Sequence, residues 1–268
     1  MPYASIDNTL QMYYELDDYT DPWKKPETIV LLHGISKNSR HWYAWPPLLA
    51  RKYRVVRPDT RGMGKSTVPP EGRKWSMTGF AHDLRTLLKR LEIGRAHLVA
   101  DTFGGPISLQ FAYEYPELVS SLTICGPVYT FAGQDKHLAD GQREVREHGV
   151  SVWAKNGAVR VFGKFNDTEL AKWYAEEMGK TSRHTILTLQ EFVLNVDLTS
   201  ILPVIRTPTL LLAGGDSEIS PGNRIAEMGR LMPHAKVVLF PDTPNNIHAL
   251  IPEKCVHELR QFLGGLQK

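Results

Sequence analysis

Residues 96–107 constrain the fold of this chain more than any other segment. Their sequence, Ala-His-Leu-Val-Ala-Asp-Thr-Phe-Gly-Gly-Pro-Ile, runs from an apolar stretch typical of a buried strand into a glycine pair that begins a helical pattern. A sharp strand-to-helix turn needs small residues, because it pushes one side chain outward and crowds its neighbours. Gly104 and Gly105 are the small residues here, and Thr102 takes the outward position. The segment therefore predicts a turn that presents the hydroxyl of Thr102.

Composition and length limit the class of protein. The 268 residues fit one domain, with room for an insertion, and 42% hydrophobic and 23% charged residues are ordinary for a globular protein. The formal net charge of +3 is spread along the chain, so we expect neither nucleic acid nor a membrane as partner. The start of the chain lacks the features of a secretory signal, and no apolar run approaches the roughly 18 residues of a membrane helix. We expect a cytoplasmic protein.

No pattern in the sequence indicates a cofactor or a metal. The two cysteines, Cys125 and Cys255, stand in apolar patterns without metal-ligand spacing, so we predict buried thiols. Gly62 and Gly64 lack the strand-then-helix spacing of a dinucleotide-binding turn. The partner that remains is a small-molecule substrate, and a homodimer stays an open option for the oligomeric state.

Strand-like and helix-like patterns alternate over most of the chain, which predicts an α/β fold with a mainly parallel sheet covered by helices. We predict strands over residues 3–6, 11–15, 28–33, 53–57, 97–101, 119–125, 209–213 and 236–240. We predict helices over residues 40–52, 78–91, 104–115, 222–232 and 252–263.

The stretch 129–202 interrupts this alternation, because it holds four amphipathic helix patterns and no convincing strand. They lie near residues 134–147, 151–162, 167–178 and 183–195, with Asp167 as an N-cap. We predict a helical cap, or lid, over 129–202 on a core formed by 1–128 and 203–268. Aromatic residues of the cap, among them Trp153, are available to line a pocket beneath it.

Several motifs follow one another in a recognisable order. A predicted strand ends in His33-Gly34-Ile35, the next leads into the segment from Asp59 to Ser66, and the turn at Thr102, the helical insertion, Gly214-Gly215-Asp216 and a late His248 come after. In this order the chain resembles the α/β-hydrolase superfamily over essentially its full length, and within it the lid-bearing esterases and C–C hydrolases. The resemblance implies a mostly parallel eight-stranded sheet flanked by helices, with an inserted helical cap.

The same resemblance implies an oxyanion hole. In the family, two backbone amides hold the negative charge that develops on an attacked carbonyl oxygen. Carried over, these are the amides of Ile35 and Phe103, and His33 belongs to the substrate pocket. We expect Asp59 and Arg61 to fix a loop beneath the site.

The catalytic triad of the family is where this chain departs from the pattern. Thr102 stands in place of the nucleophilic serine, and its methyl group restricts χ1 and crowds the path of attack. Asp101 precedes it, where the family often has histidine or glutamate. Asp101 as nucleophile would put the two glycines one place too far away, so we expect it to be a charged neighbour in the pocket.

The other two triad positions depart as well. The acid position aligns with Ser217, flanked by Asp216 and Glu218, and we predict that Asp216 is the catalytic acid. The histidine position aligns with Asn245, whose amide cannot act as a general base. His248, three residues later, is our predicted base, and Ser217 and Asn245 are predicted pocket residues.

Three hypotheses about function follow from this degenerate triad. In the first, Thr102 attacks a small, mainly apolar ester, lactone or other carbonyl compound, His248 takes its proton and Asp216 orients the imidazole. In the second, the pocket runs a lyase, isomerase or cyclase reaction without a covalent intermediate. In the third, the protein binds a ligand and has no catalytic activity.

Overall fold

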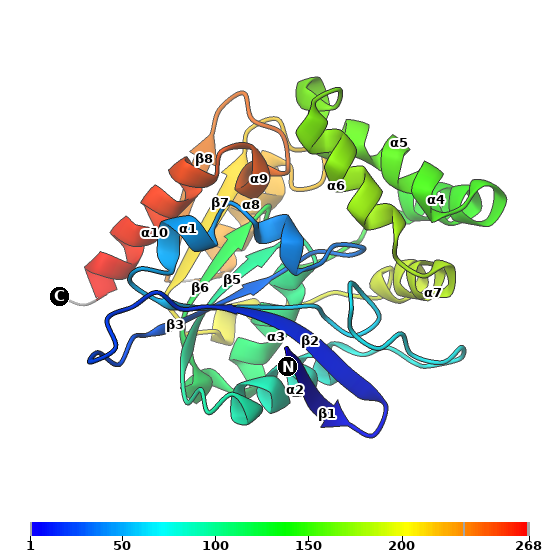
Figure 1. Ribbon diagram of the computed structural model, residues 1–268. Helices are drawn as coiled ribbons and strands as arrows, with labels where there is room; N and C mark the ends of the chain where they lie inside the picture. The colour runs from blue at the N-terminus through cyan, green and yellow to red at the C-terminus, as the bar shows by residue number, and fades with distance from the viewer. Residues whose placement is uncertain (1, 233, 267–268) are drawn as a thin grey trace.

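The computed structural model describes residues 2–232 and 234–266 of the chain. An eight-stranded sheet with the strand order β1-β2-β4-β3-β5-β6-β7-β8 forms its centre (Figure 1). Strand β2 pairs antiparallel with β1 and β4, and all other neighbours are parallel. The strands are β1 (Tyr3–Asp7), β2 (Leu10–Asp17), β3 (Thr28–Leu32), β4 (Arg54–Pro58), β5 (Ala96–Asp101), β6 (Val119–Cys125), β7 (Thr209–Gly214) and β8 (Ala235–Phe240). The fold class predicted from the sequence is confirmed.

Helices cover both faces of the sheet, which is why its central strands are apolar on both sides. In β3, Val30 and Leu32 contribute to one buried cluster with α2 (Met77–Arg90) and α3 (Gly104–Glu114). Ile29 and Leu31 face the other cluster, with α1 (Pro46–Leu49) and α10 (Pro252–Leu266). Helix α8 (Gly222–Leu231) lies on the same face of the sheet as α3. Helix α9 (Ile247–Leu250) directly precedes α10.

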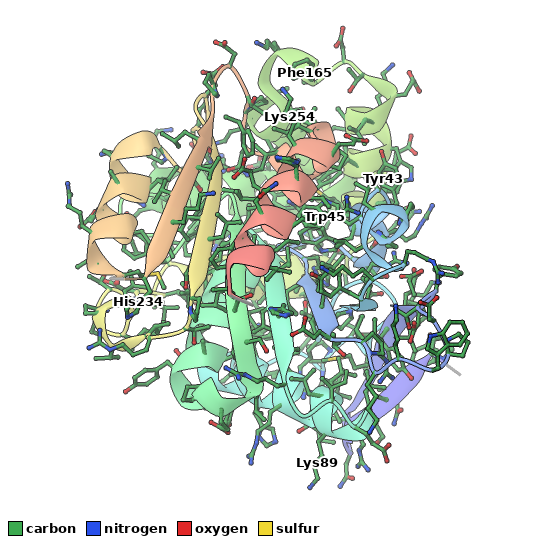
Figure 2. The ribbon with its side chains drawn as sticks, turned by 90° about the vertical axis from the view of Figure 1, so that its left-hand side faces the viewer. Tyr43, Trp45, Lys89, Phe165, His234 and Lys254 are labelled. Atoms are coloured by element: carbon green, nitrogen blue, oxygen red, sulfur yellow. The ribbon has the colours of Figure 1, made fainter. Side chains whose placement is uncertain are left out.

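The helix predicted over 40–52 is wrong. The segment forms a short 3₁₀ helix, η1 (Ser39–Trp42), and a separate four-residue α1. Pro46 and Pro47 explain the break, because proline has no N–H to donate to the carbonyl four residues earlier, as a continuous helix would require. The pieces are held by burial instead: Trp42 and Trp45 are fully buried, and Figure 2 shows Trp45 beside α10.

The chain between β6 and β7 is helical, as predicted. It contains α4 (Asp135–His148), α5 (Val150–Phe162), α6 (Glu169–Gly179) and α7 (Arg183–Val193), with the short helix η3 (Gly163–Phe165). The two other short helices are η2 (Pro116–Leu118) and η4 (Leu202–Val204). The helices α4–α7 lie together beyond one end of the sheet (Figure 1). The predicted N-cap at Asp167 is wrong, because the Thr168 hydroxyl accepts the Ala171 amide at the start of α6.

Two further observations concern the cysteines and the length of the helices. Cys125 and Cys255 are buried free thiols, as predicted. Within the described ranges, the helices are all too short or too polar to span a membrane.

Candidate active site

Thr102 occupies the turn between β5 and α3 in a strained conformation. Its φ of 43° lies in the left-handed region, which a β-branched residue rarely adopts. The turn is tightly packed: a Cβ at Gly104 would lie 2.4 Å from the Leu32 carbonyl oxygen, and one at Gly34 would lie 2.1 Å from Thr102 Oγ1. Glycines at these places therefore let β3 and its following loop approach the Thr102 hydroxyl.

The backbone amides of Ile35 and Phe103 belong to the two segments that meet at this turn. Ile35 lies in a turn closed by the Lys37 amide and the Gly34 carbonyl at 3.2 Å, with Ser36 at a φ of 62°. Phe103 directly follows Thr102, and both Ile35 and Phe103 line the same cavity as Thr102. Neither amide donates a hydrogen bond to another described residue.

His33 does not line the cavity. Its ring is fully buried, with Nε2 accepting from the Thr60 amide at 3.0 Å and Nδ1 at 2.8 Å from the Gly34 carbonyl. Because an amide can only donate, the proton must be on Nδ1, which donates to Gly34. Burial lowers the pKa of His33. The predicted pocket residue thus fixes the loop that carries Ile35.

Asp59 and Arg61 also hold loops, as predicted. Asp59 accepts the amides of Ser39 and Lys65 at 2.6 and 2.8 Å. Arg61 pairs with Asp83 and Asp7 at 2.7 and 2.6 Å. These contacts tie the segment after β4 to the N-terminal hairpin and to α2.

Asp101 is the charged centre of the site. Its Oδ2 accepts a hydrogen bond from Lys37 Nζ at 2.5 Å and another from the Thr102 hydroxyl at 3.3 Å. Both charged side chains are buried, and Lys37 also donates to Asn246 Oδ1 at 3.2 Å. Burial lowers the pKa of Lys37, whereas the charges of His248 and Lys37, against the effect of burial, hold the pKa of Asp101 below its ordinary value.

His248 does not contact Thr102 or Asp216. Its Nδ1 lies 3.3 Å from Asp101 Oδ1, a contact that falls short of hydrogen-bond geometry, and its Nε2 lies 3.2 Å from the Tyr174 hydroxyl. Burial lowers the pKa of His248 to about 4, so the ring is neutral at neutral pH. The carboxylate beside the imidazole is Asp101, because α9 lies against η1 and packs the ring against Trp42 and Tyr174. Trp45 Nε1 donates to the His248 carbonyl at 2.9 Å and holds α9 in place.

The predicted acid Asp216 is exposed, and its backbone amide donates to the Thr243 carbonyl at 3.1 Å. Ser217 and Asn245, by contrast, are both buried and hydrogen-bonded to each other, with Ser217 Oγ donating to Asn245 Oδ1 at 2.8 Å. The Asn245 amide nitrogen has no partner among the described residues. A neutral hydroxyl–amide pair therefore connects the two places where the family pattern has an acid and a histidine.

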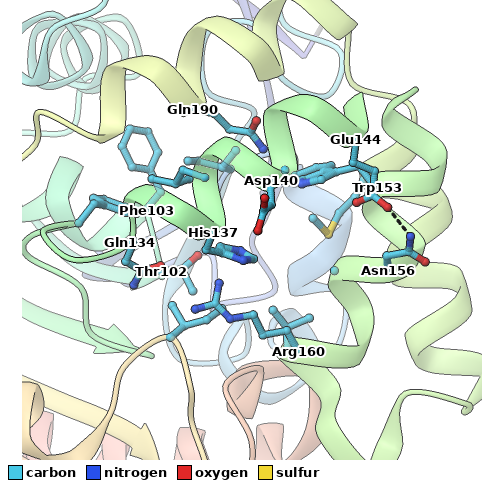
Figure 3. Close-up of a pocket in the computed structure, with 18 of the residues that line it drawn as sticks. Thr102, Phe103, Gln134, His137, Asp140, Glu144, Trp153, Asn156, Arg160 and Gln190 are labelled. Atoms are coloured by element: carbon cyan, nitrogen blue, oxygen red, sulfur yellow. Dashed lines mark hydrogen bonds between the residues drawn. The ribbon is translucent and has the colours of Figure 1, made fainter. Parts of the chain in front are cut away.

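A cavity of about 560 Å³ opens above Thr102 and Phe103. Its inner wall is mostly apolar, with Val128, Phe131, Leu138, Trp153, Val161, Met178 and Ile219. Polar side chains of α4, α5 and α7 surround the rest of it, among them His137, Asp140, Glu144, Arg160 and Gln190 (Figure 3). Of the predicted pocket residues, Trp153 lines the cavity, whereas His33, Asp101, Ser217 and Asn245 are buried behind it.

Lys37 and Gln190 are among the cavity residues that the sequence analysis missed. Lys37 lines it and pairs with Asp101, although a lysine so close to a predicted turn is usually solvated. Gln190 is only 3% exposed and its Oε1 has no partner among the described residues. The apolar environment of Asp101 was the available signal, because a buried carboxylate needs a cation nearby.

Among the described side chains, no three His, Cys, Asp or Glu residues are grouped as metal ligands. The buried cation at the site is the Lys37 ammonium, which lies against Asp101 and 5.0 Å from the centre of the Tyr174 ring.

Comparisons with known proteins agree with this fold. A family model described as alpha/beta hydrolase fold matches residues 27–250. A proposed carbamate hydrolase, RutD, of Stutzerimonas stutzeri (strain A1501) is 27% identical over 246 residues, which cover 85% of this chain and 88% of that protein.

Solved structures are similar over nearly the whole chain. The enol-lactonase from Burkholderia xenovorans LB400 has a TM-score of 0.90 at 20% identity, covering 98% of this chain and 100% of that one. An esterase from Thermogutta terrifontis has a TM-score of 0.85 at 23% identity, covering 97% and 95%. At these identities the two structures establish the fold alone.

Proposed function

Because this chain belongs to the alpha/beta hydrolase fold family, we propose that it hydrolyses small, mainly apolar esters or lactones. In this proposal Thr102 is the nucleophile, the amides of Ile35 and Phe103 form the oxyanion hole, and residues 129–202 are the cap that closes the cavity. The relatives named above are an esterase, a lactonase and a proposed carbamate hydrolase, all of which are hydrolases.

One observation carries the proposal: a strained residue presents its hydroxyl beside two unpartnered amides at an apolar cavity. Left-handed backbone at a β-branched residue costs on the order of 1–3 kcal/mol, and such strain is concentrated at functional sites. The amides of Ile35 and Phe103 keep their hydrogen-bonding capacity for a ligand, because neither donates to another described residue. These two features at one place support a site built for a ligand.

The base in this mechanism is Asp101 rather than His248. The Thr102 hydroxyl already donates to Asp101 Oδ2, so that oxygen takes the proton as Thr102 Oγ1 attacks the carbonyl carbon. The proton then passes to the leaving oxygen, and water cleaves the acyl–threonine ester to release the acid. Because Lys37 keeps the pKa of Asp101 low, the carboxylate is a weak base, and we expect slow turnover.

The test compares Thr102→Ser with Thr102→Ala on p-nitrophenyl butyrate and on δ-valerolactone. We expect the serine variant to keep or exceed the wild-type kcat, because it retains the hydroxyl without the methyl group, and the alanine variant to lose at least about 100-fold. Acid-quenched wild-type protein should carry an acyl group on Thr102 in the mass spectrum. Wild-type turnover by the alanine variant would contradict the proposal.

A second candidate is favoured by the Ser217–Asn245 pair. This pair cannot relay a proton as an imidazole and a carboxylate do, which suits a reaction without a covalent intermediate. The oxyanion hole would then polarise a ketone or ester while Asp101 and Lys37 move a proton on the substrate. This candidate predicts that Thr102→Ala remains active whereas Asp101→Asn does not, measured on the same substrates and on ketones by solvent deuterium exchange.

A further inference from the structure

Arg160 is an unusual cation, because it reaches into the cavity without a close partner. It lies on α5, and its side chain is 23% exposed. Its nearest carboxylate is the largely exposed Glu218, 3.7 Å from Nε. No described residue forms a hydrogen bond with its terminal guanidinium nitrogens, whereas the other lysine and arginine side chains that line the cavity, Lys37 and Arg143, are paired.

The surroundings of Arg160 leave room for an anion. Figure 3 shows its side chain extending from α5 across the cavity toward the part that holds His137 and Thr102. Burial, together with the positive charge of Arg160, lowers the pKa of His137, so the two groups are near each other. The side chain is largely buried, and burial lowers the pKa of Arg160; a partly desolvated guanidinium attracts a negative charge more strongly.

The acidic residues of the cavity wall do not neutralise Arg160. Asp140 pairs with Lys136 and Arg143 at 2.7 and 2.8 Å. Glu144 accepts a hydrogen bond from Asn156, and Glu147 lies 3.8 Å from His148. Asp140 and Glu144 thus have partners of their own, and the side chain of Glu147 is exposed. Apart from the 3.7 Å approach of Glu218 to Nε, no described carboxylate lies within ion-pair distance of Arg160. Its terminal nitrogens can therefore bind a carboxylate through two parallel hydrogen bonds.

We propose that Arg160 binds a carboxylate of the substrate, so that the protein prefers acidic carbonyl compounds to neutral ones. The substrate class is then a small ester, lactone or ketone with an apolar middle and a carboxylate at its far end. The apolar wall would hold the middle while the reacting carbonyl lies at Thr102. The reaction of the substrate carbonyl at Thr102 rests on the proposed function, whereas the contact between Arg160 and the substrate carboxylate does not.

The experiment therefore measures binding and turnover separately. Calorimetry compares 5-oxohexanoate with its neutral amide, and kinetics compare p-nitrophenyl hydrogen glutarate with its methyl ester. We expect Arg160→Gln to weaken binding of the keto acid, and to lower kcat/KM for the acidic ester, by about 10- to 100-fold. Both neutral compounds should change by less than about 2-fold.

Arg143→Gln is the matched control, because Arg143 lines the same cavity but is already paired with Asp140. We expect it to leave the preference for acids unchanged. Equal binding of keto acid and amide by the wild type, or equal loss in both variants, would overturn the inference. Binding of the keto acid that depends on Arg160, with no hydrolysis of either ester, would support the carboxylate site and contradict the proposed function alone.

Discussion

At the scale of single residues, Thr102 supplies a hydroxyl to the candidate active site but strains the backbone that carries it. A glycine at this position would adopt the φ of 43° without strain. Alanine would keep the strain while removing the hydroxyl and the methyl group. Because both variants lack the hydroxyl and only alanine is strained, the difference in their stability measures the backbone strain alone.

We predict that Thr102→Gly is more stable than Thr102→Ala, by on the order of 1 kcal/mol, although neither has a hydroxyl. Urea unfolding of the two variants measures the difference directly. Equal midpoints would show that the left-handed backbone at this turn is not strained in this protein.

The buried pair of Lys37 and Asp101 makes a second prediction at this scale. Asp101→Asn leaves a buried ammonium without its counter-charge, and we expect it to lower the free energy of unfolding by about 3–5 kcal/mol. The double variant with Lys37→Met should recover most of that loss, because both charges are then absent. A double variant no more stable than Asp101→Asn would show that the unpaired ammonium is not the cause of the loss.

The buried side chain of Gln190 leads to a third prediction at this scale. Its buried Oε1 has no partner among the described residues, so Gln190→Met removes an unsatisfied acceptor while keeping the length of the side chain. We expect the variant to be as stable as the wild type or more stable, by up to about 1–3 kcal/mol in urea unfolding. A clear loss of stability would mean that the amide contributes to packing more than its orphan oxygen costs.

At the scale of elements, the start of α3 depends on close packing against β3. Gly104→Ala would place a Cβ 2.4 Å from the Leu32 carbonyl oxygen, which the backbone cannot easily avoid. Gly222 stands at the equivalent first position of α8, and a Cβ there would meet nothing within 4 Å. The two glycines thus form a matched pair.

We predict that Gly104→Ala lowers the free energy of unfolding by about 1–3 kcal/mol or more, whereas Gly222→Ala leaves it unchanged or raises it slightly. Thermal and urea unfolding measure both. A similar effect of the two substitutions would show that helix propensity, rather than the contact with β3, decides the outcome.

The strand–turn–helix unit could be predicted because its signals are local: an apolar run, two glycines and one outward residue. The helix expected over 40–52 failed because its apolar spacing outweighed Pro46 in the prediction. The partners of Thr102 could not be predicted from spacing. Lys37 comes from the loop after β3 and His248 from α9, so only tertiary packing brings both of them to Asp101, the partner of the Thr102 hydroxyl.

The triad expected from Thr102, His248 and Asp216 shows the same limit. His248 lies three residues after Asn245, which aligns with the histidine of the family pattern. Its side chain therefore faces different neighbours, and the imidazole packs against Trp42 and Tyr174. The aligned positions themselves, Ser217 and Asn245, do meet, as a neutral pair. Family spacing thus located the two loops, but it did not identify the side chains that touch the hydroxyl.

At the scale of the whole molecule, buried histidines make stability depend on pH. Burial lowers the pKa of His33, His41 and His97, and lowers that of His248 to about 4. The unfolded chain takes up protons below its ordinary histidine pKa near 6.5 while the folded protein does not. The free energy of unfolding therefore falls as the pH drops below about 6.5, and for His248 the loss continues to about pH 4.

Between pH 7.5 and 4, we predict that the free energy of unfolding falls less in His248→Gln than in the wild type. The difference should be on the order of 3 kcal/mol. Urea unfolding across this range measures the slope, with the exposed His148→Gln as control. A slope identical to that of the wild type would place the acid sensitivity of the molecule in other groups.

The position of His248 has a practical consequence for finding this protein in a cell extract. Fluorophosphonate probes, which serve to catalogue serine hydrolases in whole proteomes, react with hydroxyls that an imidazole activates. Here the imidazole contacts Asp101 and Tyr174, and the hydroxyl donates to a weakly basic carboxylate. We expect the purified protein to remain unlabelled by such a probe under conditions that label a serine esterase fully, so a proteome-wide survey of this kind would pass over it.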